Sequence, residues 1–163
     1  MRYSLSAIGG KPDPSRLAPA QALGFVTELM GTSPFHAQMP VGALLPLFSS
    51  ALALDQIKLY FNDYGEFMGY VSWAFLAPDV EQRYLRGKDL NLHMFEWNEG
   101  GSLWIIDFLM PRGSINYVLD DLRDNLFREH DTITYFRIKN GRRIAKRLSR
   151  ASRNTFFGRP IIK

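Results

Sequence analysis

With 163 residues, of which 46% are hydrophobic and 22% charged, the chain is long enough for one folded domain with a core of its own. The absence of cysteine excludes disulfides, thiol catalysis and cysteine-ligated metal sites, and it fits a cytoplasmic protein. No apolar run reaches the length of a membrane span, and the first residues lack the pattern of a secretory signal. The histidines and carboxylates are too dispersed to form a recognisable metal site.

The net charge of +4 is the sum of two unlike parts. From Arg137 to the C-terminus there are ten Lys and Arg and no Asp or Glu, whereas the preceding residues carry ten Lys and Arg against 16 Asp and Glu. A basic segment on an acidic body predicts an anionic partner, which could be a nucleic acid, a membrane surface or an acidic protein.

The first third of the chain is predicted to be a mobile leader followed by helices. Residues 1–18 are rich in Gly and Pro and are expected to be mobile. Apolar residues at helical spacing predict a helix over roughly 20–31, and Pro34 permits a second helix to begin. Residues 41–54 are mostly small and apolar, which predicts a buried helix interrupted near Pro46.

The next segments favour an antiparallel hairpin and a short helix. Apolar and polar residues alternate over 57–61, turn-forming residues follow at 62–65, and a second strand is predicted over 67–76. A proline at a helix start and a glycine at its end predict a short helix over 78–87.

Residues 103–110 form the strongest strand signal, and their almost continuous apolar character implies that both faces are covered. Asp107 lies in the middle of this strand, so its carboxylate must be paired or functional. A helix is predicted over 114–128, a strand over 132–138 and a hairpin-type turn at Asn140-Gly141. This order predicts a single α/β or α+β domain with a mixed sheet, spanning residues 19–141 and followed by a basic segment, 142–163.

The stretch Ser33-Pro34-Phe35-His36 places a hydroxyl and an imidazole three residues apart, beside a proline that stiffens the turn. Histidine is the side chain that most readily accepts a proton near neutral pH. The other two histidines, His93 and His130, are predicted to be ordinary surface residues. By itself the pattern also fits a Ser-Pro helix start, so the spacing alone assigns no function.

Further short motifs follow this pattern in a fixed order. The whole series is Leu23-Gly24-x-Val26, Ser33-Pro34-x-His36, Pro40-Val41, Gln56, Ser72-Trp73-Ala74-x-Leu76, Trp97-x-x-Gly100, Trp104-Ile105-Ile106-Asp107-Phe108 and Pro111-x-Gly113. In this set, over about residues 22–130, the chain resembles the lysine acyltransferases that activate RTX protoxins.

The resemblance implies a fold related to the GCN5-type N-acetyltransferases. It also implies transfer of a fatty acyl group from acyl carrier protein, as a phosphopantetheine thioester co-substrate, to internal lysines of an RTX protoxin, with no tightly bound cofactor. The catalytic histidine of the family corresponds to His36, its nearby serine to Ser33 and its catalytic aspartate to Asp107.

The chemistry of these residue types agrees with the implied roles. A lysine amine is protonated at neutral pH and must lose a proton before it attacks a thioester, which requires a base such as His36. Asp107 could orient the imidazole and stabilise its protonated form. Ser33 could hydrogen-bond the imidazole or cap a helix. Direct transfer and an acyl-histidine intermediate are both left open.

Two further groups of residues are candidates for substrate binding. Trp73 and Trp104 are expected in the core, where either could also line an acyl channel. The basic residues after 141 recur every three or four positions and would form a cationic stripe if helical, and Arg143, Lys146 and Arg147 are then candidates for docking the acidic acyl carrier protein.

Other functions predict different features. An acyl-CoA-dependent GCN5-type N-acyltransferase usually has a Gln/Arg-x-x-Gly-x-Gly/Ala loop, whose backbone amides hold the pyrophosphate, and no such loop stands in the appropriate place. A nucleic-acid-binding module would use basic residues spread across a sheet, whereas here they lie at one end of the chain. The sequence leaves the oligomeric state open, a homodimer included.

Overall fold

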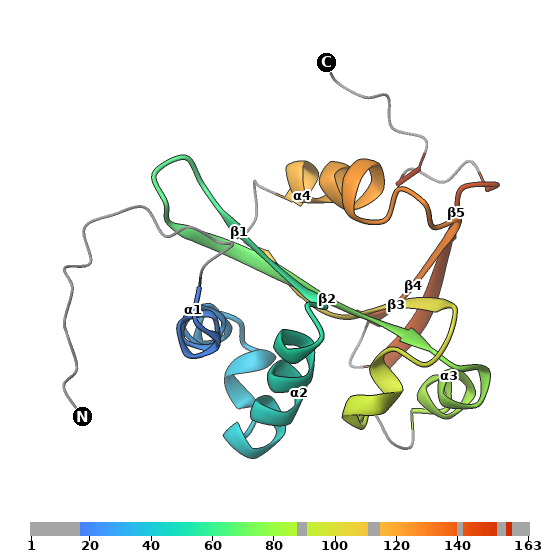
Figure 1. The fold of residues 1–163 in the computed structure, drawn as a ribbon, viewed down its shortest axis with the longest axis horizontal. Coiled ribbons are helices and arrows are strands. Elements are labelled where there is room, and N and C mark those ends of the chain that lie inside the picture. The colour runs from blue at the N-terminus through green and yellow to red at the C-terminus, as the bar shows by residue number, and fades with distance from the viewer. Residues whose placement is uncertain (1–16, 88–90, 111–114, 140–141, 153–155, 158–163) are drawn as a thin grey trace.

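The computed structural model describes residues 17–87, 91–110, 115–139, 142–152 and 156–157. The predicted leader, except its last two residues, and the predicted turn at Asn140-Gly141 lie outside these ranges. The described residues form a five-stranded mixed sheet in the order β1-β2-β3-β4-β5, with helices on both faces (Figure 1). The predicted single α+β domain with a mixed sheet is thus confirmed.

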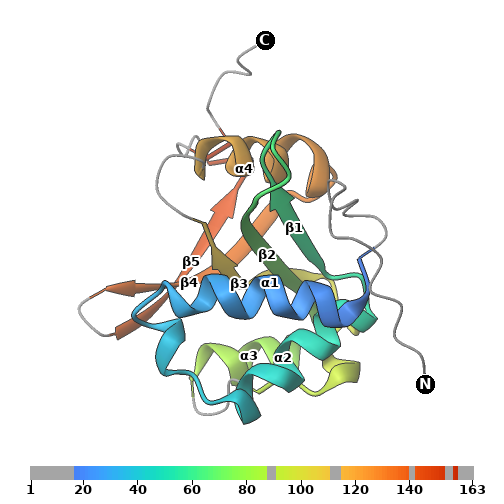
Figure 2. The ribbon, with the colours of Figure 1, turned by 90° about the vertical axis from the view of Figure 1, so that its left-hand side faces the viewer.

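Helices α1 (Pro19–Gly31), α2 (Val41–Ala53) and α3 (Pro78–Leu85) lie on one face of the sheet, and α4 (Ile115–Asp121) lies on the other (Figures 1 and 2). Their starts follow the expected chemistry, because a proline occupies the first turn of α1 and of α3. After α4 the chain continues as one π-helical turn, Leu122–Leu126. None of the described helices is long and apolar enough to cross a membrane.

The expected interruption of α2 is wrong, because the helix runs through Pro46 without a break. A proline in this position removes one backbone hydrogen bond to the residue four positions earlier, which is Gly42. Both residues are exposed, so water can satisfy the carbonyl that the proline leaves without a donor. The buried face of α2, which includes Leu44 and Phe48, supplies the packing that keeps the helix intact.

Strands β1 (Ile57–Phe61), β2 (Phe67–Leu76) and β3 (Ser102–Leu109) form an antiparallel unit that begins with the predicted hairpin. Strand β4 (Thr132–Lys139) then pairs in parallel with β3, and β5 (Arg142–Ser149) pairs antiparallel with β4. The helical stripe considered for the basic segment is therefore wrong. Eight consecutive cross-strand pairs with β4 make it an edge strand of the sheet.

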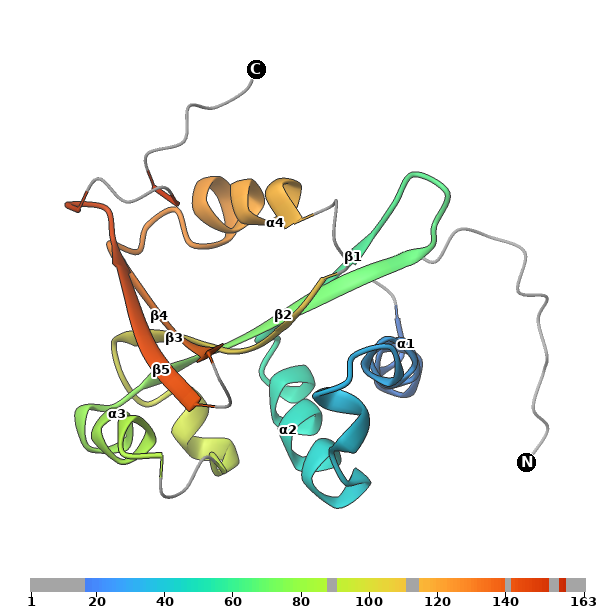
Figure 3. The same ribbon diagram turned by 180° about the vertical axis from the view of Figure 1, so that it is seen from behind.

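Two irregularities interrupt the regular pairing in the middle of the sheet. Strands β3 and β4 share only two registered pairs, Trp104 with Thr134 and Ile105 with Tyr135. Beyond Ile105 the two strands separate, and β4 and β5 turn away from the plane of β1 and β2 (Figure 3). A bulge lies at the same place, because Ser72 pairs with Asp107 whereas Trp73 pairs with Ile105. The residue left over in β3 bends the strand where it loses its β4 partner.

The Trp97-x-x-Gly100 motif has a structural explanation. Trp97 is fully buried under β2, and the backbone N–H of Gly100 donates to the carbonyl of Phe75 over 2.9 Å. A Cβ at position 100 would stand 2.0 Å from the carbonyl oxygen of Leu76, so only glycine permits this approach. The motif therefore fixes the loop that leads into β3.

Candidate active site

The segment after α1 holds Ser33 and His36 in one tight turn. The predicted second helix is reduced to a 3-10 turn, His36–Gln38, because Met39 precedes a proline and adopts an extended conformation. His36 is buried with 8% of its surface exposed, whereas Ser33 is half-buried. The Ser33 Oγ lies 2.8 Å from His36 Nδ1. The two side chains predicted from their spacing therefore do meet.

Asp107 reaches the same imidazole from the centre of the sheet. Its Oδ1 lies 3.0 Å from His36 Nε2 and also accepts the backbone N–H of Phe108 over 2.9 Å. The β3 bulge places Ile106 and Asp107 on the same face, since Ile106 packs into the cluster under α3 and Asp107 meets His36 of the 3-10 turn. The predicted partnership of His36 and Asp107, across 71 residues of sequence, is present in the fold.

Sequence reasoning missed Tyr70 of β2. Its hydroxyl donates to Asp107 Oδ2 over 2.7 Å, and its ring is fully buried against Phe48 of α2. Burial raises the pKa of Tyr70 far above its usual range, and the charge of Asp107 and their hydrogen bond act in the same direction. The phenol therefore stays neutral and donates. In the sequence, Tyr70 looks like one more aromatic of an apolar strand.

Ser33, His36 and Asp107 form a chain of hydrogen bonds, called the relay below, along which a proton could move. An ionised carboxylate only accepts, so a neutral imidazole in this arrangement would carry its proton on Nε2 towards Asp107 and leave the lone pair of Nδ1 for the hydroxyl of Ser33. This is the order hydroxyl, imidazole and carboxylate of the hydrolase triad, with the two ring nitrogens exchanged. Both ring nitrogens are occupied and the ring is buried, whereas Ser33, at one end of the relay, is half-buried.

The two candidate tryptophans lie on opposite faces of the sheet. Trp73 packs against Phe127 on the α4 face, away from His36. Trp104 lies on the Asp107 face, where its Nε1 donates to Glu81 over 2.9 Å. It lines a pocket of about 390 Å³ between α3 and the strands, together with Leu85, Thr134, Ala145 and Arg147. Of the two, only Trp104 lines a cavity on the side of the sheet that carries His36.

The three basic candidates for donor docking also divide between two faces, because neighbouring residues of a strand point in opposite directions. Arg147 faces α3 and forms an ion pair with Glu81 over 3.1 Å, whereas Lys146 is exposed on the other face. Arg143 shares the face of Arg147, and its charge affects the pKa of the buried phenol of Tyr84. Burial raises the pKa of Tyr84 to about 12, with the charge of Arg143 opposing and that of Asp107 adding to the rise.

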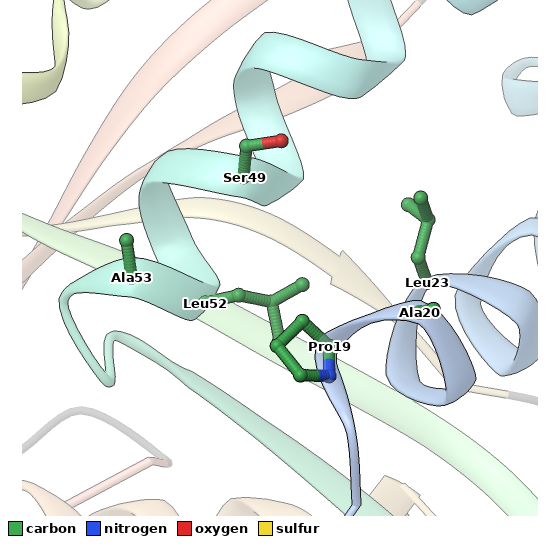
Figure 4. Close-up of a pocket in the computed structure, with 6 residues that line it drawn as sticks. All are labelled: Pro19, Ala20, Leu23, Ser49, Leu52 and Ala53. Atoms are coloured by element: carbon green, nitrogen blue, oxygen red, sulfur yellow. The ribbon is translucent and has the colours of Figure 1, made fainter. Parts of the chain in front are cut away.

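The second pocket and the other two histidines lie apart from the predicted site residues. A shallow apolar groove of about 260 Å³ lies between the start of α1 and the end of α2, at the opposite end of α1 from Ser33 (Figure 4). His93 is exposed, as predicted, but His130 is half-buried between the rings of Phe75 and Phe127. In the described part of the chain, no three His, Asp or Glu side chains gather as metal ligands would.

Comparison with known proteins matches residues 15–151 to the family model of the RTX toxin acyltransferases. The chain belongs to the RTX toxin acyltransferase family. Ser33, His36, Tyr70 and Asp107 all lie inside the matched region, so the hydrogen-bonded site is part of the family domain.

Several curated proteins are similar to this chain. The RTX-II toxin-activating lysine-acyltransferase of Actinobacillus pleuropneumoniae is 35% identical over 62% of this chain and 62% of its own. The protein-lysine myristoyltransferase of Escherichia coli is 31% identical over 68% of this chain and 66% of its own. An uncharacterised protein of Synechocystis is 30% identical over 64% of this chain and 71% of its own. The chain thus spans about two thirds of these relatives.

Proposed function

We propose that the protein is a protein-lysine acyltransferase that transfers a fatty acyl chain from acyl carrier protein to internal lysines of an RTX protoxin in the cytoplasm. The observation that carries the proposal is the buried His36 imidazole held between Asp107 and the hydroxyl of Ser33. The names of relatives as lysine acyltransferases and as a lysine myristoyltransferase support the same reaction class.

The relay supplies the proton transfer that amide formation needs. The substrate ammonium first loses one proton to solvent, and the neutral amine attacks the thioester carbonyl and forms the new C–N bond. The second amine proton passes through the Ser33 hydroxyl to His36 Nδ1, while Asp107 stabilises the imidazolium and stays ionised. When the tetrahedral intermediate collapses, the C–S bond breaks and the thiolate takes a proton back from the imidazolium. The products are the amide and the free thiol, and the enzyme is restored.

The separation of β3 from β4 supports a carrier-bound donor. Beyond Ile105 the two strands are no longer paired, so backbone groups of both strands are available to the amides of a phosphopantetheine arm. Arg143 lies on the same face of β5 as Arg147, which pairs with Glu81 of α3, so it supplies a positive charge on the face covered by α3. The pocket beside Trp104 lies on this face as well. A likeness to the GCN5-type fold is part of the same proposal.

Co-expression with a candidate protoxin, followed by mass spectrometry of lysine acylation, tests the reaction. We expect acylated lysines with the wild-type enzyme and none with His36→Ala, because the variant has no base. His93→Ala is the matched control, since His93 is exposed and lies outside the site. Undiminished acylation by His36→Ala at equal expression would remove His36 from the mechanism.

The carrier dependence is tested separately with purified donors. Arg143→Glu is expected to raise the KM for acyl carrier protein at low salt, because it places a like charge against an acidic partner. The same substitution should leave the rate with a short acyl-pantetheine thioester unchanged. Lys146→Glu, on the other face of β5, is the control of equal charge change. An equal effect of Arg143→Glu on both donors would contradict docking of the carrier at this strand.

A further inference from the structure

We propose that Tyr70 is a positioning residue of the active site, which acts on His36 through the carboxylate of Asp107. The inference rests on the proposed function, since it treats His36 and Asp107 as part of the reacting centre. The phenol donates to Asp107 Oδ2 over 2.7 Å, whereas His36 Nε2 lies 3.0 Å from Oδ1. The two oxygens of one carboxylate are thus divided between the phenol and the imidazole.

Tyr70 is surrounded by apolar side chains, and its hydroxyl donates to Asp107. The residue is completely buried in a cluster of α1 and α2 side chains that includes Val26, Met30 and Phe48, and the Phe48 ring meets it edge-on at 5.3 Å. A buried hydroxyl without an acceptor is costly, and Asp107 is the acceptor that the described residues give it. The hydrogen bond is therefore held in place by packing.

This bond has a consequence for the relay. A carboxylate bound only through Oδ1, by His36 and by the Phe108 amide, is free to turn about its terminal bond and to present either oxygen to the ring. The phenol on Oδ2 removes that freedom. Oδ1 then stays directed at Nε2, the ring keeps its proton there, and Nδ1 stays available to Ser33.

Tyr70→Phe removes the hydroxyl and keeps the ring, so it tests the role directly. We expect kcat for lysine acylation to fall about ten- to hundredfold with KM for both substrates unchanged, because a hydrogen bond to a charged group is lost. In ¹⁵N NMR of the protein without substrates, the His36 ring should change from a single Nε2–H tautomer to a mixture. A single Nε2–H tautomer in the variant overturns the proposal.

Tyr60→Phe is the matched control. Tyr60 donates to Asp121 Oδ2 over 2.8 Å on the opposite face of the sheet, so the same atom is deleted from a similar pair. We expect a similar loss of thermal stability, an unchanged His36 tautomer and unchanged kcat. An equal loss of kcat in both variants would mean that Tyr70 acts only through stability, and it would overturn the proposal.

If Tyr70→Phe does not fold, a second replacement at the same position tests the proposal. Incorporation of 3,5-difluorotyrosine at position 70 keeps the ring and the hydroxyl and makes the phenol a stronger donor. It should draw charge from Asp107 and move the hydrogen-bonded Nε2 proton resonance of His36 upfield, and an unmoved resonance overturns the proposal. The NMR measurement needs no substrate. If the wild-type enzyme acylates no lysine, the proposed function is refuted, whereas the role of Tyr70 is still tested by the His36 tautomer.

Discussion

On each side of the sheet, one aspartate accepts a hydrogen bond from a tyrosine and from a basic nitrogen, Asp107 from strand β3 and Asp121 from helix α4. On the face covered by α1 and α2, Asp107 accepts from Tyr70 and from the imidazole of His36. On the α4 face, Asp121 accepts hydrogen bonds from Tyr60 and from the ammonium group of Lys58. The two aspartates differ in the basic group, and this difference separates a candidate catalytic centre from a structural link.

Asp121 is bound by the Tyr60 hydroxyl over 2.8 Å and by the Lys58 ammonium over 2.7 Å. Burial acts to raise the pKa of Asp121, but the hydrogen bonds from Lys58, Asn125 and Tyr60 outweigh it and hold the pKa below its usual range. Lysine stays charged throughout the neutral range, so this pair ties β1 to α4 without exchanging a proton. Histidine is the side chain suited to proton transfer in that range, so we expect proton transfer at the Asp107 site and none at the Asp121 site.

The largest expected effect comes from matched amide substitutions of the two aspartates. Asp107→Asn should lower kcat about 10³- to 10⁴-fold, because the amide no longer stabilises the imidazolium and can reverse the tautomer of His36. Asp121→Asn should leave kcat unchanged and lower the free energy of unfolding by about 1–3 kcal/mol. Acylation kinetics and urea unfolding of both variants measure this, and a large loss of kcat in Asp121→Asn would remove the distinction.

Ser33 should show an intermediate effect, because its hydroxyl ends the relay. Ser33→Ala is expected to lower kcat about 10²-fold if the hydroxyl carries the proton. Thr32→Ala is the neighbouring control, since the Thr32 hydroxyl donates to the Leu29 carbonyl and does not touch the imidazole. A Ser33→Ala variant with normal kcat and reduced stability would assign the serine to capping alone.

The smallest expected effect concerns stability in acid. The pKa of Asp121 is lowered in the folded state, so the unfolded state takes up a proton more readily. The stability from this group is present above its unfolded pKa and is lost as pH falls, from about pH 5 downward. Urea unfolding at several pH values should show a smaller acid loss in Asp121→Asn than in the wild type. Identical slopes would mean that Lys58 and Tyr60 do not stabilise the ionised form.

Much of the local structure follows from the spacing of apolar residues. The pattern predicts α1, the β1–β2 hairpin, α3, the central strand and β4, and the structure confirms each of them. The prediction fails for β5, where charges recur at helical spacing but Ile144 and Leu148 are too few to define a period. Pairing with β4 determines that segment, and a sequence pattern does not contain a partner strand.

The candidate site divides in the same way. The sequence and the family resemblance identify Ser33, His36 and Asp107, because their residue types carry recognisable chemistry. Only the tertiary structure brings Tyr70 to the carboxylate, separates Trp73 from Trp104 and places Arg147 against Glu81. These contacts depend on strand register, on the bulge in β3 and on the separation of β4 from β3. They arise from long-range pairing, which local residue preferences do not encode.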